Sequence, residues 1–158
     1  MTDAIKISKL TKDFGNFKLG PLDLKVKKGA ITGFIGENGA GKSTTVKLIL
    51  GVLGGDRGTI EIFDKDIKDL SVYERYKIGF VFDDLFLPDS MKVFEIEKMH
   101  SLLYKGYWEE ERFYEFVENF SLPTDIPISA FSRGMNMKLG LALAMSHGAE
   151  LLILDEPT

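Results

Sequence analysis

The residues best suited to chemistry occupy positions 36 to 44, where Gly-Glu-Asn-Gly-Ala-Gly-Lys-Ser-Thr matches the pattern G-x-x-x-x-G-K-[ST]. We expect Gly36, Gly39 and Gly41 to allow backbone conformations in which successive N–H groups converge on phosphate oxygens. Lys42 would add a positive charge for the β and γ phosphates, and the Ser43 hydroxyl would be a Mg²⁺ ligand. The motif therefore predicts a nucleotide site, whose cofactor-binding residues are Gly36, Asn38, Gly39, Ala40, Gly41, Lys42, Ser43 and Thr44.

Two predicted elements position this loop. The apolar run at 30–35, Ala-Ile-Thr-Gly-Phe-Ile, is typical of a buried strand that ends at Gly36, and residues 44–50 carry apolar side chains at helical spacing. A helix that begins near Ser43 would direct its positive end toward the same anion. The alternative is a glycine turn that precedes Lys-Ser by accident, and the flanking pattern disfavours it.

The rest of the chain alternates between strand and helix patterns. Residues 4–10, 22–26 and 59–63 alternate apolar and polar, which predicts a small antiparallel sheet with Phe14 on a glycine turn between the first two strands. Residues 78–82 and 151–154 read as buried strands, and residues 93–120 as an aromatic helical block. Ser132 is a candidate N-cap for a helix that continues to about Ser146.

Composition fits one compact domain, or a large piece of one. The chain has 158 residues, of which 44% are hydrophobic and 28% charged, with no cysteine, a formal charge of −4 and a pI near 5.3. We expect a cytoplasmic protein, because no stretch has the length of a membrane span and the N-terminus lacks a signal-peptide core. The acidic balance argues against a large nucleic-acid surface.

Four segments agree in order and spacing with a known family. They are the phosphate loop, Ile-Gly-Phe-Val-Phe-Asp at 78–83, Phe-Ser-Arg-Gly-Met at 131–135 and Leu-Leu-Ile-Leu-Asp-Glu-Pro-Thr at 151–158. Together they resemble an ABC-transporter ATPase subunit. The resemblance implies an α/β fold with a P-loop NTPase (RecA-like) core at 30–57, 78–83 and 148–158. It also implies an antiparallel β subdomain at 1–29 and 58–64 and a helical subdomain at 85–147.

The same resemblance implies ATP and Mg²⁺ as cofactors and assigns roles to the acids at the end of the chain. Asp155 would hold Mg²⁺ through water, while Glu156 would polarise the attacking water and act with Lys42 in catalysis. These parts suit phosphoryl transfer, which is catalysed mainly by positioning and charge stabilisation. The alternative is an apolar strand that ends in two exposed acids.

Three further residues gain roles by resemblance. Ser132 and the backbone of Gly134 would contact the nucleotide of a second subunit in a head-to-tail dimer, homomeric or heteromeric. Phe14 would stack on adenine, since stacking needs only the face of an aromatic ring. Without the resemblance, Ser132 reads as a helix cap and Phe14 as a residue that fills the turn.

The chain departs from the family pattern in two places. Asp83 occupies the position of a glutamine near Mg²⁺; we expect it to keep the metal contact, and a solvated acid is the alternative. The sequence stops at Thr158, before the segment that carries the family's γ-phosphate histidine. We expect a fragment of a longer polypeptide that is poorly stable and inactive alone; the alternative is a chain that cannot complete the hydrolytic site.

The predicted function is an ATPase subunit that energises a membrane permease, which docks on the helical subdomain, with export the expected direction. A soluble ABC ATPase acting on ribosomes or DNA is the alternative. A switch GTPase or kinase is disfavoured, because no Asn-Lys-x-Asp motif follows the loop.

Overall fold

The computed structural model describes residues 2–82 and 87–155, so the predicted site residues Asp83 and Glu156 lie outside the described part. The chain divides into two compact units, Met1–Ser71 and Val72–Thr158. No helix in the described ranges is both long enough and apolar enough to cross a membrane.

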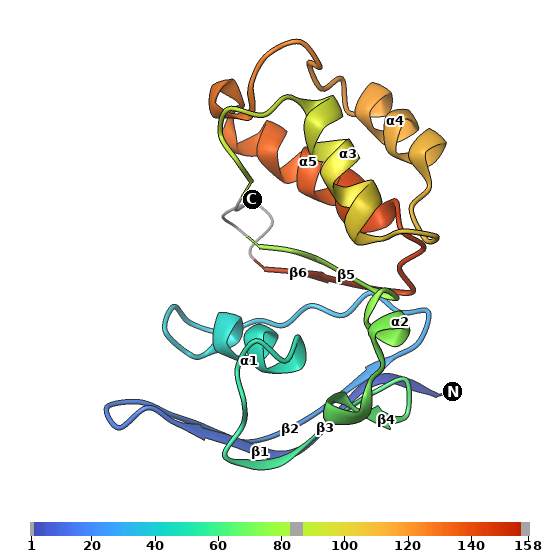
Figure 1. Ribbon diagram of the computed structural model, residues 1–158. Helices are drawn as coiled ribbons and strands as arrows, with labels where there is room; N and C mark the ends of the chain where they lie inside the picture. Colours follow the sequence, from blue (N-terminus) through green and yellow to red (C-terminus); the bar gives the residue numbers. More distant parts are fainter. Residues whose placement is uncertain (1, 83–86, 156–158) are drawn as a thin grey trace. The chain divides into compact units, whose positions relative to one another are not determined.

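The first unit contains the predicted antiparallel sheet (Figure 1). Its strands are β1 (Asp3–Asp13), β2 (Lys18–Lys27), β3 (Arg57–Ile62) and the short β4 (Lys65–Asp66), in the order β2-β1-β3-β4. Ile7 pairs with Leu24 of β2 and with Ile60 of β3, so the alternating apolar side chains meet across the strands. The alternation seen in the sequence is therefore confirmed as a sheet with one apolar face.

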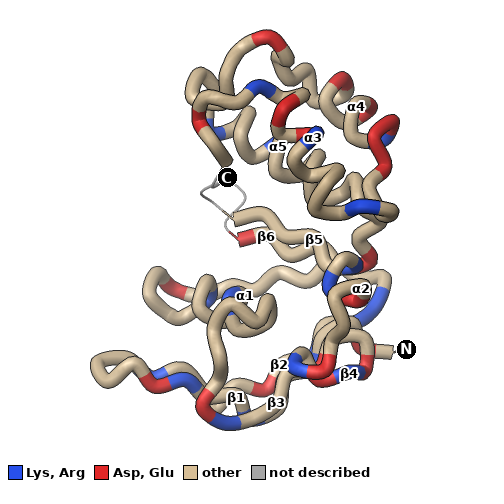
Figure 2. The backbone as a smooth tube through the Cα atoms, in the orientation of Figure 1, with Lys and Arg blue, Asp and Glu red and all other residues tan. Residues whose placement is uncertain are grey.

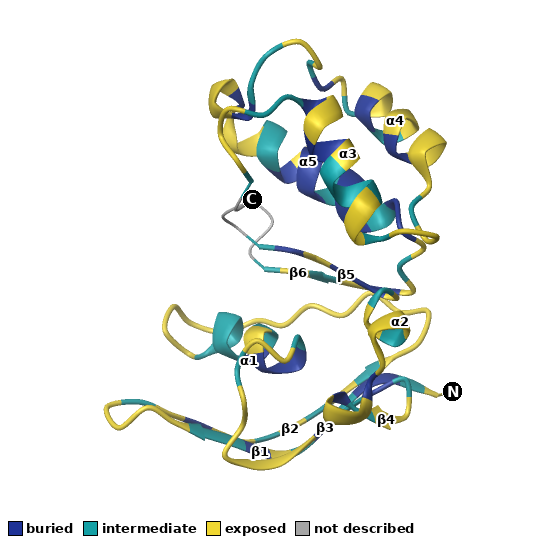
Figure 3. Cartoon of the chain, viewed as in Figure 1, coloured by how far each residue is buried: buried dark blue, intermediate teal, exposed yellow. Residues whose placement is uncertain are grey.

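Helix α1 (Lys42–Ile49) follows the phosphate loop, as predicted, but the strand expected before the loop is wrong. Residues 30–36 have no strand assignment, and the stretch is exposed throughout (Figure 3). Ile35, for example, is 95% exposed. A continuous apolar run forms a stable strand only when neighbouring strands pair with it and cover it, and no described strand pairs with this one.

The second unit holds a parallel pair of strands under helices (Figure 1). Strand β5 (Ile78–Val81) pairs with β6 (Leu151–Leu154) in the register Ile78↔Leu151. Helix α5 (Arg133–Met145) lies directly on β5, because a Cβ added to Gly79 would be only 2.5 Å from the carbonyl oxygen of Ala144. The prediction that 151–154 is fully buried is wrong: one face of β6 remains open, with Leu152 38% exposed.

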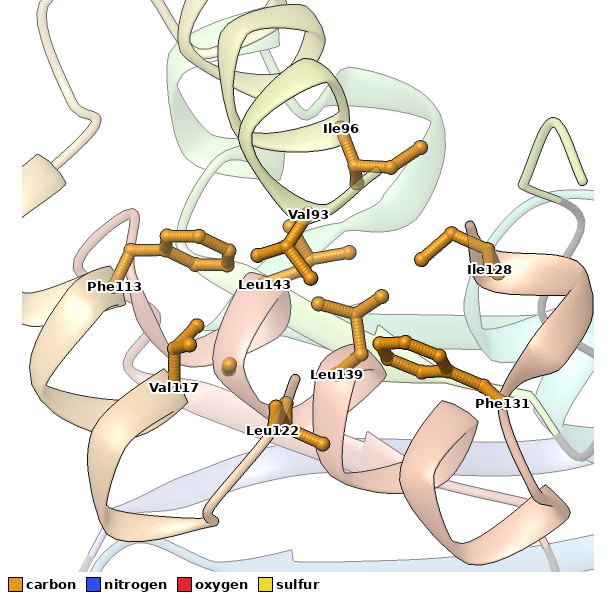
Figure 4. Close-up of a cluster of buried hydrophobic side chains, with 10 residues drawn as sticks. Val93, Ile96, Phe113, Val117, Leu122, Ile128, Phe131, Leu139 and Leu143 are labelled. Carbon is orange, nitrogen blue, oxygen red and sulfur yellow. The ribbon is translucent and has the colours of Figure 1, made fainter. Parts of the chain in front are cut away.

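The helical part of this unit has its own core. Helices α3 (Val93–Leu103), α4 (Glu110–Asn119) and α5 contribute most of it, together with the segment that joins α4 to α5 (Figure 4). Phe113 and Leu139 are completely buried there. This cluster fixes the position of α5, whose N-terminus carries the predicted signature residues.

Short elements complete the described chain. They are the 3₁₀ turns η1 (Ile67–Asp69) and η2 (Ile128–Ala130) and the helix α2 (Val72–Arg75). The proposed division into β subdomain, P-loop core and helical subdomain stays a prediction.

Candidate functional site

The phosphate loop has a conformation that requires glycine at two positions. Gly39 and Gly41 have φ values of +83° and +93°, a region that side chains with a Cβ rarely adopt. Gly36 is not in this region, so its expected conformational role is not confirmed. The N–H of Ala40 donates to the carbonyl of Glu37 at 3.1 Å and closes a tight turn between these glycines.

Gly41 is the N-cap of α1, and two hydrogen bonds from Thr45 fix the start of this helix. The N–H and the hydroxyl of Thr45 both donate to the Gly41 carbonyl, at 2.8 and 2.9 Å. No acidic residue occupies the first turn, which begins with Lys42, Ser43 and Thr44. The positive end of the helix is therefore not neutralised by a carboxylate of that turn, which favours an anion.

Lys42 folds back over the loop. Its ammonium group donates to the carbonyl oxygens of Gly36 and Glu37, at 2.9 and 3.0 Å. These contacts hold the positive charge of Lys42 beside the loop that the motif predicts to bind phosphate. A phosphate group that arrived there would exchange the two neutral carbonyl acceptors for charged oxygens, which form stronger hydrogen bonds.

Phe14 lies on the β1–β2 loop, as predicted, and is 44% exposed. Its N–H donates to the carbonyl of Phe17 at 2.8 Å, and the two rings are stacked with centroids 6.2 Å apart. The Lys12 ammonium lies 5.9 Å from the Phe14 ring centroid and also pairs with Asp56 at 2.9 Å. An exposed aromatic ring on an ordered loop is available for stacking with a planar ligand.

Asp56 and Asp13 anchor this loop to the sheet. Asp56 accepts from the Lys12 ammonium at 2.9 Å and from the Asp13 N–H at 2.7 Å. The hydrogen bond from Lys12, followed by the one from the Asp13 backbone, lowers the pKa of the Asp56 carboxyl. Asp13 in turn accepts from the Lys18 ammonium and the Gly15 N–H, and these bonds lower its pKa as well.

Ser132 is confirmed as the N-cap of α5. Its hydroxyl accepts a hydrogen bond from the N–H of Met135 at 3.2 Å, and Ser132 and Gly134 are both exposed. A Cβ added to Gly134 would meet only the Ser132 hydroxyl, at 4.0 Å, so the backbone there is open to approach. This open helix N-terminus is compatible with the assigned contact to a phosphate.

Asp155 follows β6 at the carboxyl end of the parallel pair. Its N–H donates to the carbonyl of Val81 at 3.0 Å, which places it beside the end of β5. Within 2–82 and 87–155, no three His, Asp or Glu side chains are grouped to hold a metal ion, and the two further acids assigned to the site lie outside these ranges. The predicted metal ligands in the described ranges are Ser43 in the first unit and Asp155 in the second, and both supply oxygen donors, the type that Mg²⁺ prefers.

The predicted residues thus fall into two sets. Phe14 and the phosphate loop belong to the first unit, and Ser132, Gly134 and Asp155 belong to the second. Within the first unit, sequence reasoning missed Phe17, whose ring reaches both Phe14 and the loop. The only sequence signal for it is a second aromatic residue at the end of the same turn.

Comparison with known proteins identifies the family. The sequence profile described as ABC transporter matches residues 19–158. The chain belongs to the ABC transporter family.

Relatives in this ABC family include the bacitracin transport ATP-binding protein BcrA of Bacillus licheniformis. It is 34% identical over 161 residues, which cover 100% of this chain and 52% of BcrA. The sulfate/thiosulfate import ATP-binding protein CysA of Vibrio cholerae is 32% identical over 98% of the chain and 43% of its own length. The ABC chain thus spans about half the length of these relatives.

A solved structure of an ATP-binding subunit of an ABC transporter has a similar fold. It matches 98% of this chain and 66% of its own chain, with a TM-score of 0.84 and 26% identity. The expected P-loop NTPase fold is therefore confirmed for this ABC domain.

Proposed function

We propose that the chain is the nucleotide-binding part of an ABC transporter subunit that binds Mg·ATP and hydrolyses it to drive a membrane permease. The observation that carries the proposal is the geometry at the start of α1. Two glycines with positive φ lead into a helix whose first turn holds no acid, and Lys42 lies folded over the loop. This arrangement suits a polyphosphate.

In this proposal the first unit binds the nucleotide. The N–H groups of the loop and of the first turn of α1 would hold the β and γ phosphates, with the Lys42 ammonium moving from its carbonyl partners to phosphate oxygens. Phe14 would stack on the adenine ring. Each contact uses a group that the structure leaves at or near the surface of this unit.

The metal and the attacking water are assigned to Ser43 of α1 and to acids that follow the two parallel strands in the sequence. Ser43, Asp155 and Asp83 would hold Mg²⁺, which supplies charge stabilisation for the transferred phosphoryl group. Glu156 would orient the water for attack. Asp155 supports this assignment through its position beside the end of β5.

A second ABC subunit, identical or related, would complete the site. The exposed N-terminus of α5, with the Ser132 cap and the open backbone at Gly134, would contact the γ-phosphate bound by that partner. Two composite sites per dimer would follow, each with a phosphate loop from one subunit and a signature helix from the other.

The helical part of the second unit would receive the permease at the cytoplasmic side of the membrane. Acidic residues gather along α4 (Figure 2), whose first turn includes Glu110 and Glu111. Cytoplasmic loops of membrane proteins are enriched in Lys and Arg, so this surface has the complementary charge. We further propose export as the direction, which the Ser-x-Gly-Met form of the signature at 132–135 favours, whereas the similarity to CysA, an import protein, does not support it.

The test is ATP turnover by the full protein that carries this chain, with Glu156→Gln as the variant. We expect magnesium-dependent release of phosphate by the wild type, and loss of turnover with a stable ATP-bound dimer in the variant. Turnover at the wild-type rate in Glu156→Gln would exclude that carboxylate as the group that orients water. Co-purification with a permease rather than with ribosomes is expected of the same protein.

The metal role of Asp83 has its own test. Asp83→Gln should leave ATP affinity nearly unchanged and shift the Mg²⁺ concentration required for half-maximal turnover. An unchanged Mg²⁺ profile would show that Asp83 does not contact the metal.

A further inference from the structure

We propose that Phe17 is a positioning residue for nucleotide binding, which holds the Phe14 ring in place for the base and ties the β1–β2 loop to the phosphate loop. This inference rests on the proposed binding of ATP by the same unit. It adds a second aromatic residue, Phe17, to a base site that the motif assigns to Phe14 alone.

The first observation is the pairing of the two rings. Phe14 and Phe17 are stacked, with an interplanar angle of 28° and centroids 6.2 Å apart, which is within the range of favourable aromatic pairs. The Phe14 N–H also donates to the Phe17 carbonyl at 2.8 Å. Both the backbone and the ring of Phe17 therefore restrain Phe14, which is otherwise 44% exposed.

The second observation is the approach of Phe17 to the phosphate loop. A Cβ added to Gly41 would lie 3.2 Å from Cζ of Phe17 and 2.7 Å from Cδ1 of Leu19. Gly41 is the residue from which α1 begins, and it has no room for a side chain on this side. The Phe17 ring thus lies between the exposed Phe14 ring and the start of the helix that would hold the phosphates.

This placement has a consequence for binding. A single exposed ring on a turn would lose conformational freedom when a base stacks on it, and that loss reduces affinity. Phe17 restricts the Phe14 ring before the ligand arrives, while the ion pairs of Asp13 and Asp56 hold the ends of the turn. The effect should appear for ligands that carry a base and not for phosphate chains alone.

The experiment compares two probes by calorimetry with the full protein: ATP and inorganic tripolyphosphate, each with Mg²⁺. Phe17→Leu removes the ring and keeps an apolar side chain. We expect it to weaken ATP binding about two- to tenfold, the range that such aromatic pairs contribute, and to leave tripolyphosphate affinity within about twofold. Phe17→Tyr keeps the ring and should restore ATP affinity.

A double-mutant cycle tests the route through Phe14. If Phe17 acts by holding Phe14, then adding Phe17→Leu to Phe14→Ala should cause no further loss of ATP affinity. Phe94→Leu, which replaces an exposed phenylalanine of α3, is the matched control and should change neither affinity. Thermal melts of each variant would verify that the fold is intact.

Two results would overturn the proposal. Equal losses for ATP and tripolyphosphate in Phe17→Leu would mean that Phe17 acts on the phosphate loop alone. Losses that add in the double variant would mean that Phe17 acts independently of Phe14. A wild-type protein that binds neither probe would instead contradict the proposed function itself, so the two failures are distinguishable.

Discussion

Replacing Lys42 by alanine should separate nucleotide binding from stability. In the free protein the Lys42 ammonium donates to the carbonyls of Gly36 and Glu37 at 2.9 and 3.0 Å, and both of these contacts are exposed. Exposed contacts of this kind contribute little, so we expect the free energy of unfolding to change by less than about 1 kcal/mol.

The expected loss of ATP affinity is much larger. A hydrogen bond to a charged group contributes about 1.5–3 kcal/mol, and a factor of ten in affinity corresponds to about 1.4 kcal/mol. Because binding would also break the two carbonyl contacts, part of this gain is offset. We therefore expect Lys42→Ala to weaken Mg·ATP binding about 10- to 100-fold.

Calorimetric titration with Mg·ATP, beside denaturant unfolding of the same samples, measures both quantities. Lys47→Ala is the matched control, because Lys47 is an exposed lysine in the last turn of the same helix, and it should bind ATP like the wild type. Binding of ATP by Lys42→Ala within twofold of the wild type would exclude Lys42 as a phosphate-binding residue. A loss of more than about 2 kcal/mol of stability in the variant would make Lys42 a structural residue instead.

Three further outcomes are expected from denaturant unfolding. Leu139→Ala, at a completely buried site, should lower the free energy of unfolding by about 2–5 kcal/mol, whereas Leu102→Ala, at an exposed site of α3, should change it by less than about 0.5 kcal/mol; equal effects would contradict the packing of the helical core. Ser132→Ala should cost about 1 kcal/mol through loss of the cap on α5 and Ser132→Asn should retain most of it, so a neutral alanine variant would exclude a stabilising cap. Burial lowers the pKa of His100 and of His147 below the ordinary 6.5, so the free energy of unfolding should be highest above that pH and fall as the pH drops below it. The fall should be less steep when His147 is replaced by glutamine. A free energy of unfolding that stays constant between pH 7.5 and 5.5 would contradict this prediction.

Local sequence patterns correctly predicted two kinds of element: strands whose partners are close in sequence, and helices, which form their own hydrogen bonds. The alternation in residues 4–10 and 22–26 became the β1–β2 pair, because a four-residue turn brings these strands together. The helix after the phosphate loop and the Ser132 cap were also predicted correctly, since spacing and capping chemistry are encoded within a few residues.

The failures concern features that depend on distant partners. The apolar run at 30–35 has strand composition, yet no described strand pairs with it and its side chains are exposed. Likewise, β6 was expected to be buried on both faces, but Leu152 is 38% exposed, and among the described strands only β5 pairs with β6. Apolar composition indicates that such a segment can be buried, but it does not determine whether another part of the chain pairs with the segment and covers it.

The candidate site shows the same division. The motif identified the phosphate loop, and the structure confirmed glycine conformations at Gly39 and Gly41 but not at Gly36. Phe17 could not be selected from the sequence, because its contact with Gly41 joins a hairpin turn to a helix start further along the chain.

Backbone amide NMR during titration with Mg·ATP tests the central claim most directly. If residues 36–44 cradle the phosphates, saturating shifts should appear at the amides of Gly39 to Thr44 and, through the base, at Phe14 and Phe17, and Lys42→Ala should require much higher ATP concentrations for the same shifts. Saturable binding that leaves these amides unchanged, or no binding at millimolar ATP, would contradict the account.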